Sequence, residues 1–160
     1  DAPHCSELLK KHDVPVIVSA VYRLPMRRSE PYDTPFTLPE RLRKAGIKFC
    51  IAGGNRFSTA NSRNLPYHAA MAVGFGLPQD TALRSVTLSA AEILGVADRV
   101  GSLEVGKDAT LFIADGDILE TPTQVELAFI QGRAVDLSDR HKRLWKKYQE
   151  KYRRQRAAAE

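Results

Sequence analysis

Two patterns of apolar positions alternate along the first third of the chain. Residues 14–21 and 47–52 form short, nearly continuous apolar runs, which are typical of parallel strands covered on both faces. Between them, Thr37 and Glu40 have capping-box spacing, Pro39 suits a first helical turn, and Gly46 suits a helix end. The pattern predicts a right-handed parallel strand–helix–strand unit.

The rest of the chain is predicted to form helices and then short strands. In the first helix we expect Leu8 and Leu9 to face inward, and Asn64 is placed to cap a later helix. Gln131-Gly132 is expected to form a tight turn between two strands. The expected elements are helices at residues 3–11, 65–73, 79–86 and 90–94 and strands at 109–114, 125–130 and 133–137.

A glycine-punctuated segment at residues 95–117 joins the predicted helices to these strands. Ser89 and Glu92 have capping-box spacing ahead of it, and Gly95 suits a helix end because it adopts positive φ without a Cβ penalty. Gly101 and Gly106 bracket a short reach that is expected to turn twice. These residues favour a structural role for the loop.

Together with the region after the second strand, this segment resembles the amidohydrolases, in particular the imidazolonepropionase-related branch. The matching residues are Leu94-Gly95, Gly101-Ser102-Leu103-Glu104, Gly106-Lys107-Asp108-Ala109, Asn64-Leu65-Pro66-Tyr67-His68-Ala69-Ala70 and Gly76-Leu77-Pro78. The resemblance implies an α/β fold: a partial (β/α)8 barrel holding the last two strands with their helices (residues 1–95), part of a small β-sandwich (96–137) and a basic C-terminal helix (138–160). The chain is then expected to be the C-terminal portion of a longer parent.

The resemblance also implies an activity for that parent. Amidohydrolases cleave non-peptide C–N bonds, often in cyclic amides, with water activated by a divalent metal, here expected to be zinc. The resemblance places the histidine ligands upstream, so no metal is expected in this chain alone, and the expected partners are a small-molecule substrate and the missing N-terminal part of the barrel. The aspartate expected after the last barrel strand is replaced by Gly53 and Gly54, beside Asn55. We therefore expect this piece alone to be inactive and assign it no catalytic residue.

A candidate substrate rim remains. Arg23, Asn55, Arg56, Arg63 and His68 lie on or beside the two loops that would face the barrel mouth. We expect a solvated surface for the arginines, with an anion-binding rim as the alternative. The four histidines of the chain show no H-x-H or H-E-x-x-H spacing. Cys5 and Cys50 are expected to be free thiols, with Cys50 inside an apolar run.

Charge is concentrated at the C-terminal end. With 43% hydrophobic and 27% charged residues the composition is that of a globular protein, and the net charge is +5. Residues 139–160 carry nine Lys or Arg and three acids, or +6, which leaves −1 for the rest. Leu144, Trp145, Tyr148 and Tyr152 lie at helical spacing there. We expect a helix docked on the body by this stripe. A nucleic-acid or acidic-lipid binder is the alternative.

Three functional hypotheses follow from these observations. The first is the C-terminal piece of a metal-dependent amidohydrolase. The second is a non-catalytic descendant that keeps the barrel as a binding or scaffold module after losing its aspartate, and the third is a binder that acts through the basic tail. The family-like detail of the body favours the first over the third, so neither nucleic acid nor a membrane is expected as the main partner, and a homo-oligomer is compatible with the sequence.

Overall fold

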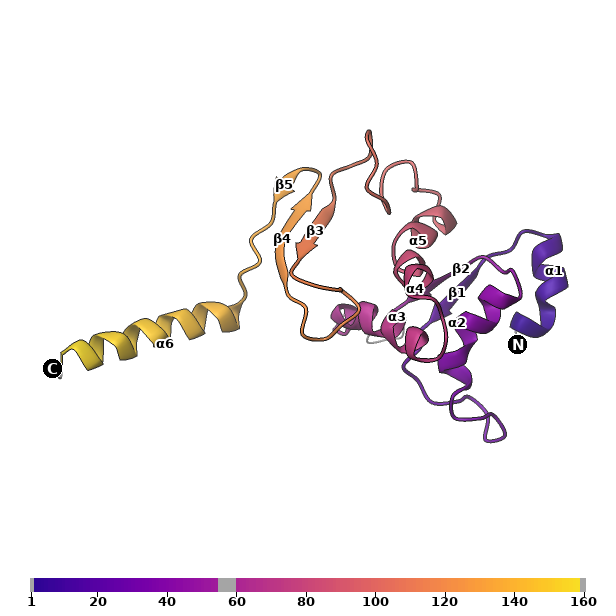
Figure 1. The fold of residues 1–160 in the computed structure, drawn as a ribbon, viewed down its shortest axis with the longest axis horizontal. Coiled ribbons are helices and arrows are strands. Elements are labelled where there is room, and N and C mark those ends of the chain that lie inside the picture. The colour runs from indigo at the N-terminus through magenta and orange to yellow at the C-terminus, as the bar shows by residue number, and fades with distance from the viewer. Residues whose placement is uncertain (1, 55–59, 159–160) are drawn as a thin grey trace.

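The computed structural model describes residues 2–54 and 60–158. The chain runs from a helical body with a two-stranded parallel sheet, through a separate antiparallel sheet, to a projecting helix (Figure 1). In chain order the elements are η1 (Ala2–Cys5), α1 (Ser6–Lys11), β1 (Val16–Ser19), α2 (Thr34–Lys44), β2 (Phe49–Ala52), η2 (Ser62–Asn64), α3 (Leu65–Gly74), α4 (Gln79–Ser85), α5 (Leu88–Ile93), β3 (Leu111–Ala114), β4 (Val125–Ile130), β5 (Arg133–Ala134) and α6 (Arg140–Ala157).

The parallel unit predicted from the apolar runs is confirmed. β1 pairs with β2 in parallel, with Val16 opposite Phe49 and Ser19 opposite Ala52, and α2 makes the crossover between them. Helices α2, α3, α4 and α5 all pack against β2. The core of the body therefore lies around β2, where Phe49, Cys50 and Ile51 are all buried.

Strand β1 is covered less completely than its sequence predicts. Val18 is buried, whereas Ile17 on the other face is 53% exposed. A continuous apolar run predicts burial on both faces, and in this chain only one face of β1 is covered. The N-terminal helix differs in the same way, because Leu8 is 61% exposed and only Leu9 packs against the core.

Helix α2 begins earlier than predicted. It starts at Thr34 with Pro35 in its first turn, so Thr37 lies inside the helix and its hydroxyl donates to the Asp33 carbonyl at 3.1 Å. Pro39 then lies in the helix interior and is buried. The predicted capping box is therefore wrong. Two prolines four residues apart both suit a first turn, and the first of them occupies it.

The second predicted capping box is also wrong. Helix α5 begins at Leu88, and its N-cap Thr87 makes no capping bond because its hydroxyl donates back to the Leu83 carbonyl at 2.8 Å. The Glu92 carboxylate accepts two hydrogen bonds from Arg84, at 2.7 and 2.8 Å, instead of reaching the cap. The helix end at Gly95 is confirmed, with φ of 71°.

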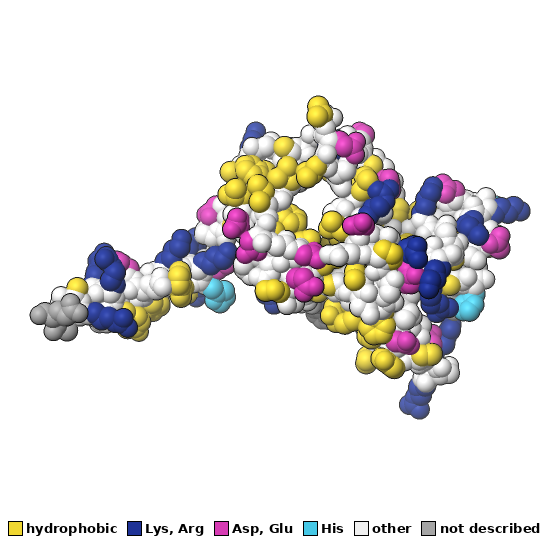
Figure 2. All heavy atoms as spheres, in the orientation of Figure 1, with side chains coloured by type: hydrophobic (Ala, Val, Ile, Leu, Met, Phe, Trp, Pro, Cys, Tyr) yellow, Lys and Arg dark blue, Asp and Glu magenta, His cyan; other side chains and the backbone are white. Residues whose placement is uncertain are grey.

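The antiparallel sheet has the strand order β3–β4–β5. Gln131 and Gly132 connect β4 to β5 with φ of 51° and 76°, which confirms the predicted tight turn. Although residues 109–114 form an apolar run, Phe112 and Ile113 of β3 are 50% and 47% exposed. Hydrophobic side chains gather on this sheet at the surface (Figure 2).

Helix α6 projects from the rest of the chain (Figure 1). Asp139 caps it by accepting from the Lys142 backbone N–H at 2.8 Å. Its apolar stripe is exposed, with Trp145 at 60% and Tyr152 at 54%, so the expected docking onto the body is wrong. Among residues 2–54 and 60–158, no helix is both long enough and apolar enough to span a bilayer.

Candidate functional site

The carboxyl ends of the two parallel strands bring Ser19 and the Gly53-Gly54 pair together. Since β1 and β2 are parallel and in register, the residues that follow them share one edge of the sheet. The Ser19 hydroxyl donates to the Gly54 carbonyl, which ties the two strand ends together. In parallel α/β folds this edge is where ligands bind.

The two glycines differ in the space around them. A Cβ at Gly53 would meet no atom of the described residues within 4 Å, whereas a Cβ at Gly54 would lie 3.0 Å from the Ser19 hydroxyl oxygen. Position 53 therefore has room for a side chain, and position 54 does not while Ser19 keeps its present rotamer. Glycine supplies no ligand or proton acceptor from a side chain. In the described part of the chain, no three His, Cys, Asp or Glu residues lie close enough to hold a metal ion.

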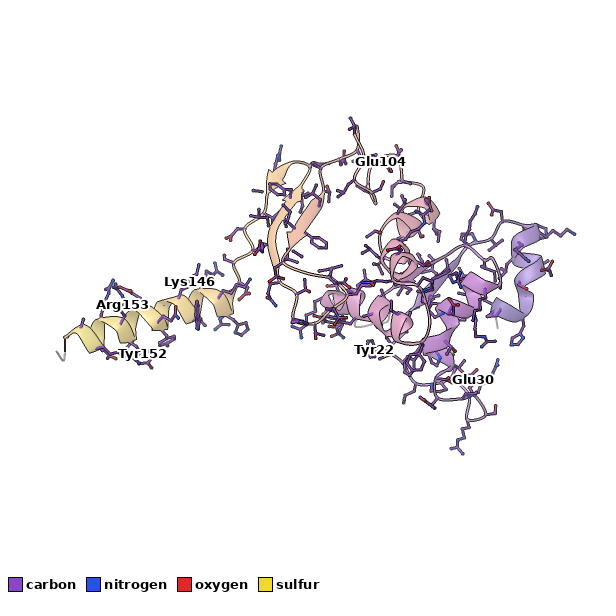
Figure 3. All side chains as sticks on the ribbon, in the orientation of Figure 1. Tyr22, Glu30, Glu104, Lys146, Tyr152 and Arg153 are labelled. Atoms are coloured by element: carbon purple, nitrogen blue, oxygen red, sulfur yellow. The ribbon has the colours of Figure 1, made fainter. Side chains whose placement is uncertain are left out.

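His68 connects the loop after β1 to the helix after β2. It lies in the first turn of α3 and is 7% exposed, and its Nδ1 accepts a hydrogen bond from the Tyr22 backbone N–H at 3.1 Å. The Tyr22 and His68 rings lie 5.5 Å apart, and Figure 3 labels Tyr22 beside α3. Burial lowers the pKa of His68. The neutral imidazole then carries its proton on Nε2, where it can donate a hydrogen bond.

A cavity of about 550 Å³ lies beside this contact, between α3 and the loop that contains Leu119. The cavity wall is aromatic and apolar at Tyr22, Tyr67 and Met71. His68 adds a hydrogen-bond donor, and Glu120 adds a carboxylate. Ser19, Gly53 and Gly54 do not line it, so the cavity neighbours the strand ends without including them. Its walls suit a small, partly aromatic molecule with a hydrogen-bond acceptor.

Of the predicted rim residues, the structure describes Arg23, Arg63 and His68. Arg23 follows Tyr22 and is partly buried, while Arg63 is exposed in η2. Neither Arg23 nor Arg63 is among the described residues that line the cavity beside His68. Asn55 and Arg56 lie outside the described residues. The rim stays a prediction, and His68 is the member with a defined geometry. Ser19 was not among the predicted site residues, although it is the one polar residue within the apolar run 14–21.

A second cavity, of about 640 Å³, opens at the other ends of the strands and contains several charged residues. These charges neutralise one another: Lys48 pairs with Asp13 at 2.8 Å and Arg84 with Glu92 at 2.7 Å. Arg43, which also lines it, pairs with Glu40 at 2.7 Å. Because the cations are paired and the cavity lies away from the carboxyl ends of the strands, it is the weaker candidate.

The sequence pattern of the amidohydrolase family matches residues 36–136, which is more than half of the chain. This chain belongs to the amidohydrolase family. The imidazolonepropionase of Mesorhizobium japonicum is 35% identical over 105 residues, 65% of this chain and 24% of that protein. The imidazolonepropionase of Brucella anthropi is 32% identical over 126 residues, 78% of this chain and 29% of that protein. The resemblance to the imidazolonepropionase-related branch is thus confirmed.

The fold agrees with this membership. An amidohydrolase from Thermotoga maritima MSB8 superposes with a TM-score of 0.70 and 26% identity, over 84% of this chain and 34% of that structure. The expectation of an α/β fold with parallel strands, similar to the barrel hydrolases, is confirmed. The chain spans about a quarter of the length of the two curated relatives, at 24% and 29%.

Proposed function

We propose that this chain forms the C-terminal portion of a metal-dependent amidohydrolase. In this proposal β1 and β2 are the last two barrel strands within residues 1–95, and β3–β5 belong to a small β-sandwich within residues 96–137. The basic helix occupies residues 138–160. The family match over residues 36–136 carries the proposal, together with the parallel pair that ends at a shared polar edge. The partner is the N-terminal part of the barrel.

The proposed reaction of the complete parent is hydrolysis of a non-peptide C–N bond in a small cyclic amide. A divalent metal, proposed to be zinc, would supply the activated water in such a reaction. The described residues do not fit a metal by themselves, because Gly53 and Gly54 replace the expected aspartate and no ligand cluster is present among them. The ligands are therefore assigned to the missing part of the barrel.

The residues of this chain have a narrower role in the proposed site. Ser19 holds the β2 end against β1, and His68 holds the loop that begins at Tyr22. As a neutral donor at Nε2, His68 suits a carbonyl or another acceptor better than an anion, because no positive charge accompanies it. The chain would thus shape and orient one side of the site.

Metal content and activity of the full-length parent test the proposal together. Imidazolone propionate, the compound for which the relatives are named, is the first substrate to assay. Bound zinc, with hydrolysis that is lost on chelation and restored by zinc, supports the hydrolase. A parent that holds no metal and leaves this and related cyclic amides intact contradicts it.

The Gly53-Gly54 pair favours a second candidate, a non-catalytic amidohydrolase-like binding or scaffold protein. Gly53 makes this candidate testable, since a Cβ placed there meets no atom of the described residues within 4 Å. In a hydrolase weakened only by the missing aspartate, Gly53→Asp in the full-length parent raises metal occupancy and turnover, whereas Gly53→Ala does not. If Gly53→Asp raises neither, the non-catalytic candidate is favoured.

A further inference from the structure

The surface of α6 is divided between one aromatic stripe and several cationic sides. At about 3.6 residues per turn, Leu144, Trp145, Tyr148 and Tyr152 fall within roughly 100° of the helix circumference. All four are exposed, from 39% for Leu144 to 60% for Trp145, and the Tyr148 and Tyr152 rings stack 6.4 Å apart. Figure 3 shows Tyr152 on a different side of the helix from Lys146 and Arg153. The helix is therefore amphipathic with its apolar side uncovered.

The cations of this segment are mostly unneutralised. Of its acids, Asp139 caps the helix, and Glu150 accepts from both Arg153 and Arg154 at 2.7–2.9 Å. The remaining cations form no ion pair with a carboxylate in the described part of the chain: Arg140, Lys142, Arg143, Lys146, Lys147, Lys151 and Arg156.

Lys151 places a positive charge directly beside the aromatic stripe. Its Nζ lies 6.0 Å from the Tyr148 ring centre and 5.9 Å from that of Tyr152, so a cation flanks the aromatic surface directly. A lysine in this position can extend its charge toward a phosphate while its stem and the neighbouring rings remain in an apolar layer. This order of apolar, aromatic and cationic groups is the order found across a lipid headgroup region.

We propose that α6 lies flat on an anionic lipid surface, with its aromatic stripe in the headgroup layer and its lysines and arginines on the lipid phosphates. The family-like detail of the body led us to expect no membrane partner, and the sequence also predicted that the body would cover the stripe. The stripe is exposed, so the acidic-lipid alternative stands open. A second copy of α6 is a poor occupant because two segments of +6 repel each other. A double-stranded nucleic acid would engage the cations and leave the stripe in water, whereas a single strand can stack its bases on such rings, so a single-stranded oligonucleotide is one arm of the test.

Trp145 is the only tryptophan in the chain, so its fluorescence reports on this helix alone. The full chain is mixed with vesicles of phosphatidylcholine, with or without phosphatidylserine. We expect a blue shift of the Trp145 emission with the phosphatidylserine vesicles only, and we expect added salt to weaken it. No shift with these vesicles, or an equal shift with pure phosphatidylcholine, overturns the proposal.

A matched pair of variants separates the stripe from unspecific charge attraction. Tyr148→Ala with Tyr152→Ala keeps the tryptophan reporter and the net charge, and should weaken vesicle affinity about tenfold or more. Gln149→Ala lies outside the stripe and should bind like the wild type. Circular dichroism checks that the helix is retained. Equal binding by both variants contradicts the proposal, and so does a Trp145 response to a single-stranded oligonucleotide that vesicles do not compete away.

Discussion

His68 gives the stability of the chain a pH dependence that can be measured. Burial lowers the pKa of His68 below its usual value of 6.5, so the unfolded chain binds a proton on this ring at pH values where the folded chain does not. The contribution of His68 to the free energy of unfolding should therefore be fully present above about pH 6.5. It should decrease as the pH falls from there toward the pKa of His68 in the folded chain.

The variant His68→Asn isolates this effect. Its side-chain oxygen can accept the hydrogen bond from the Tyr22 N–H but does not titrate in this range. We expect urea unfolding to show a smaller loss of stability between pH 7.5 and 5.5 in the variant than in the wild type. The same slope in both proteins would mean that His68 is accessible to protons in the folded chain.

The two glycines after β2 should respond differently to alanine. Gly53→Ala adds a methyl group to open space and should be neutral or slightly stabilising, by about 0.5 kcal/mol. Gly54→Ala brings a Cβ to 3.0 Å from the Ser19 hydroxyl and should cost about 1 kcal/mol. The difference in the free energy of unfolding between these variants is the measurement.

A double-mutant cycle tests the cause of that cost. Ser19→Ala removes the close oxygen and leaves the Ser19 Cβ at 3.9 Å from the new methyl group, an ordinary contact. The cost of Gly54→Ala should therefore be smaller in the Ser19→Ala background. An unchanged cost would assign the effect to the backbone of residue 54.

At the scale of elements, Gly101 and Gly106 form a matched pair within one loop. Both have strongly positive φ, at 98° and 97°, so alanine strains the backbone about equally at either position. A Cβ at Gly101 would also lie 2.7 Å from the Ala91 Cβ and 3.0 Å from the Leu88 Cα, whereas a Cβ at Gly106 meets nothing within 4 Å. Gly101→Ala should thus cost about 1–3 kcal/mol more than Gly106→Ala in urea unfolding. Equal costs would show that the loop moves away from α5.

The elements also show what local sequence could predict. The two parallel strands follow from continuous apolar runs, and the turn at Gln131-Gly132 follows from its residue types. Both signals depend on nearby residues only, and both elements were predicted correctly. The starts of α2 and α5 were predicted wrongly. The expected caps, Thr37 and Ser89, lie inside helices that begin at Thr34 and Leu88, and the Thr37 hydroxyl bonds the Asp33 carbonyl instead of capping a helix.

The candidate site was predictable only in part, for a similar reason. The strand ends followed from the apolar pattern, and the loss of the aspartate at Gly53 and Gly54 could be seen only through the family resemblance. The contact between His68 and Tyr22 joins residues 46 positions apart, and no local sequence pattern predicts it. The hydrogen bond from Ser19 to Gly54 spans 35 positions and is not predicted by a local pattern either.

At the scale of the whole molecule, exposed apolar side chains lie on the antiparallel sheet as well as on the helical body. Phe112, Leu127 and Ile130 on the antiparallel sheet are each at least half exposed, as is Ile17 on β1. Exposed apolar strand faces are unusual in an isolated domain and are typical of surfaces that another segment covers. This distribution supports the proposal that the chain completes a larger barrel and sandwich.

Helix α6 stands apart from that body, and removing it tests the arrangement. A chain that ends at Ser138 loses an exposed stripe and few contacts, so the thermal midpoint of the body, followed by circular dichroism, should be nearly unchanged.

Leu42→Ala is the sensitivity control: Leu42 is fully buried, and its truncation should cost about 2–5 kcal/mol. The shortened chain has a net charge of −1, so both measurements belong in dilute solution where association is weak. A midpoint that falls as far as in Leu42→Ala would mean that the stripe packs on the body in solution. The stripe would then not be exposed for lipid binding, and that proposal would be contradicted as well.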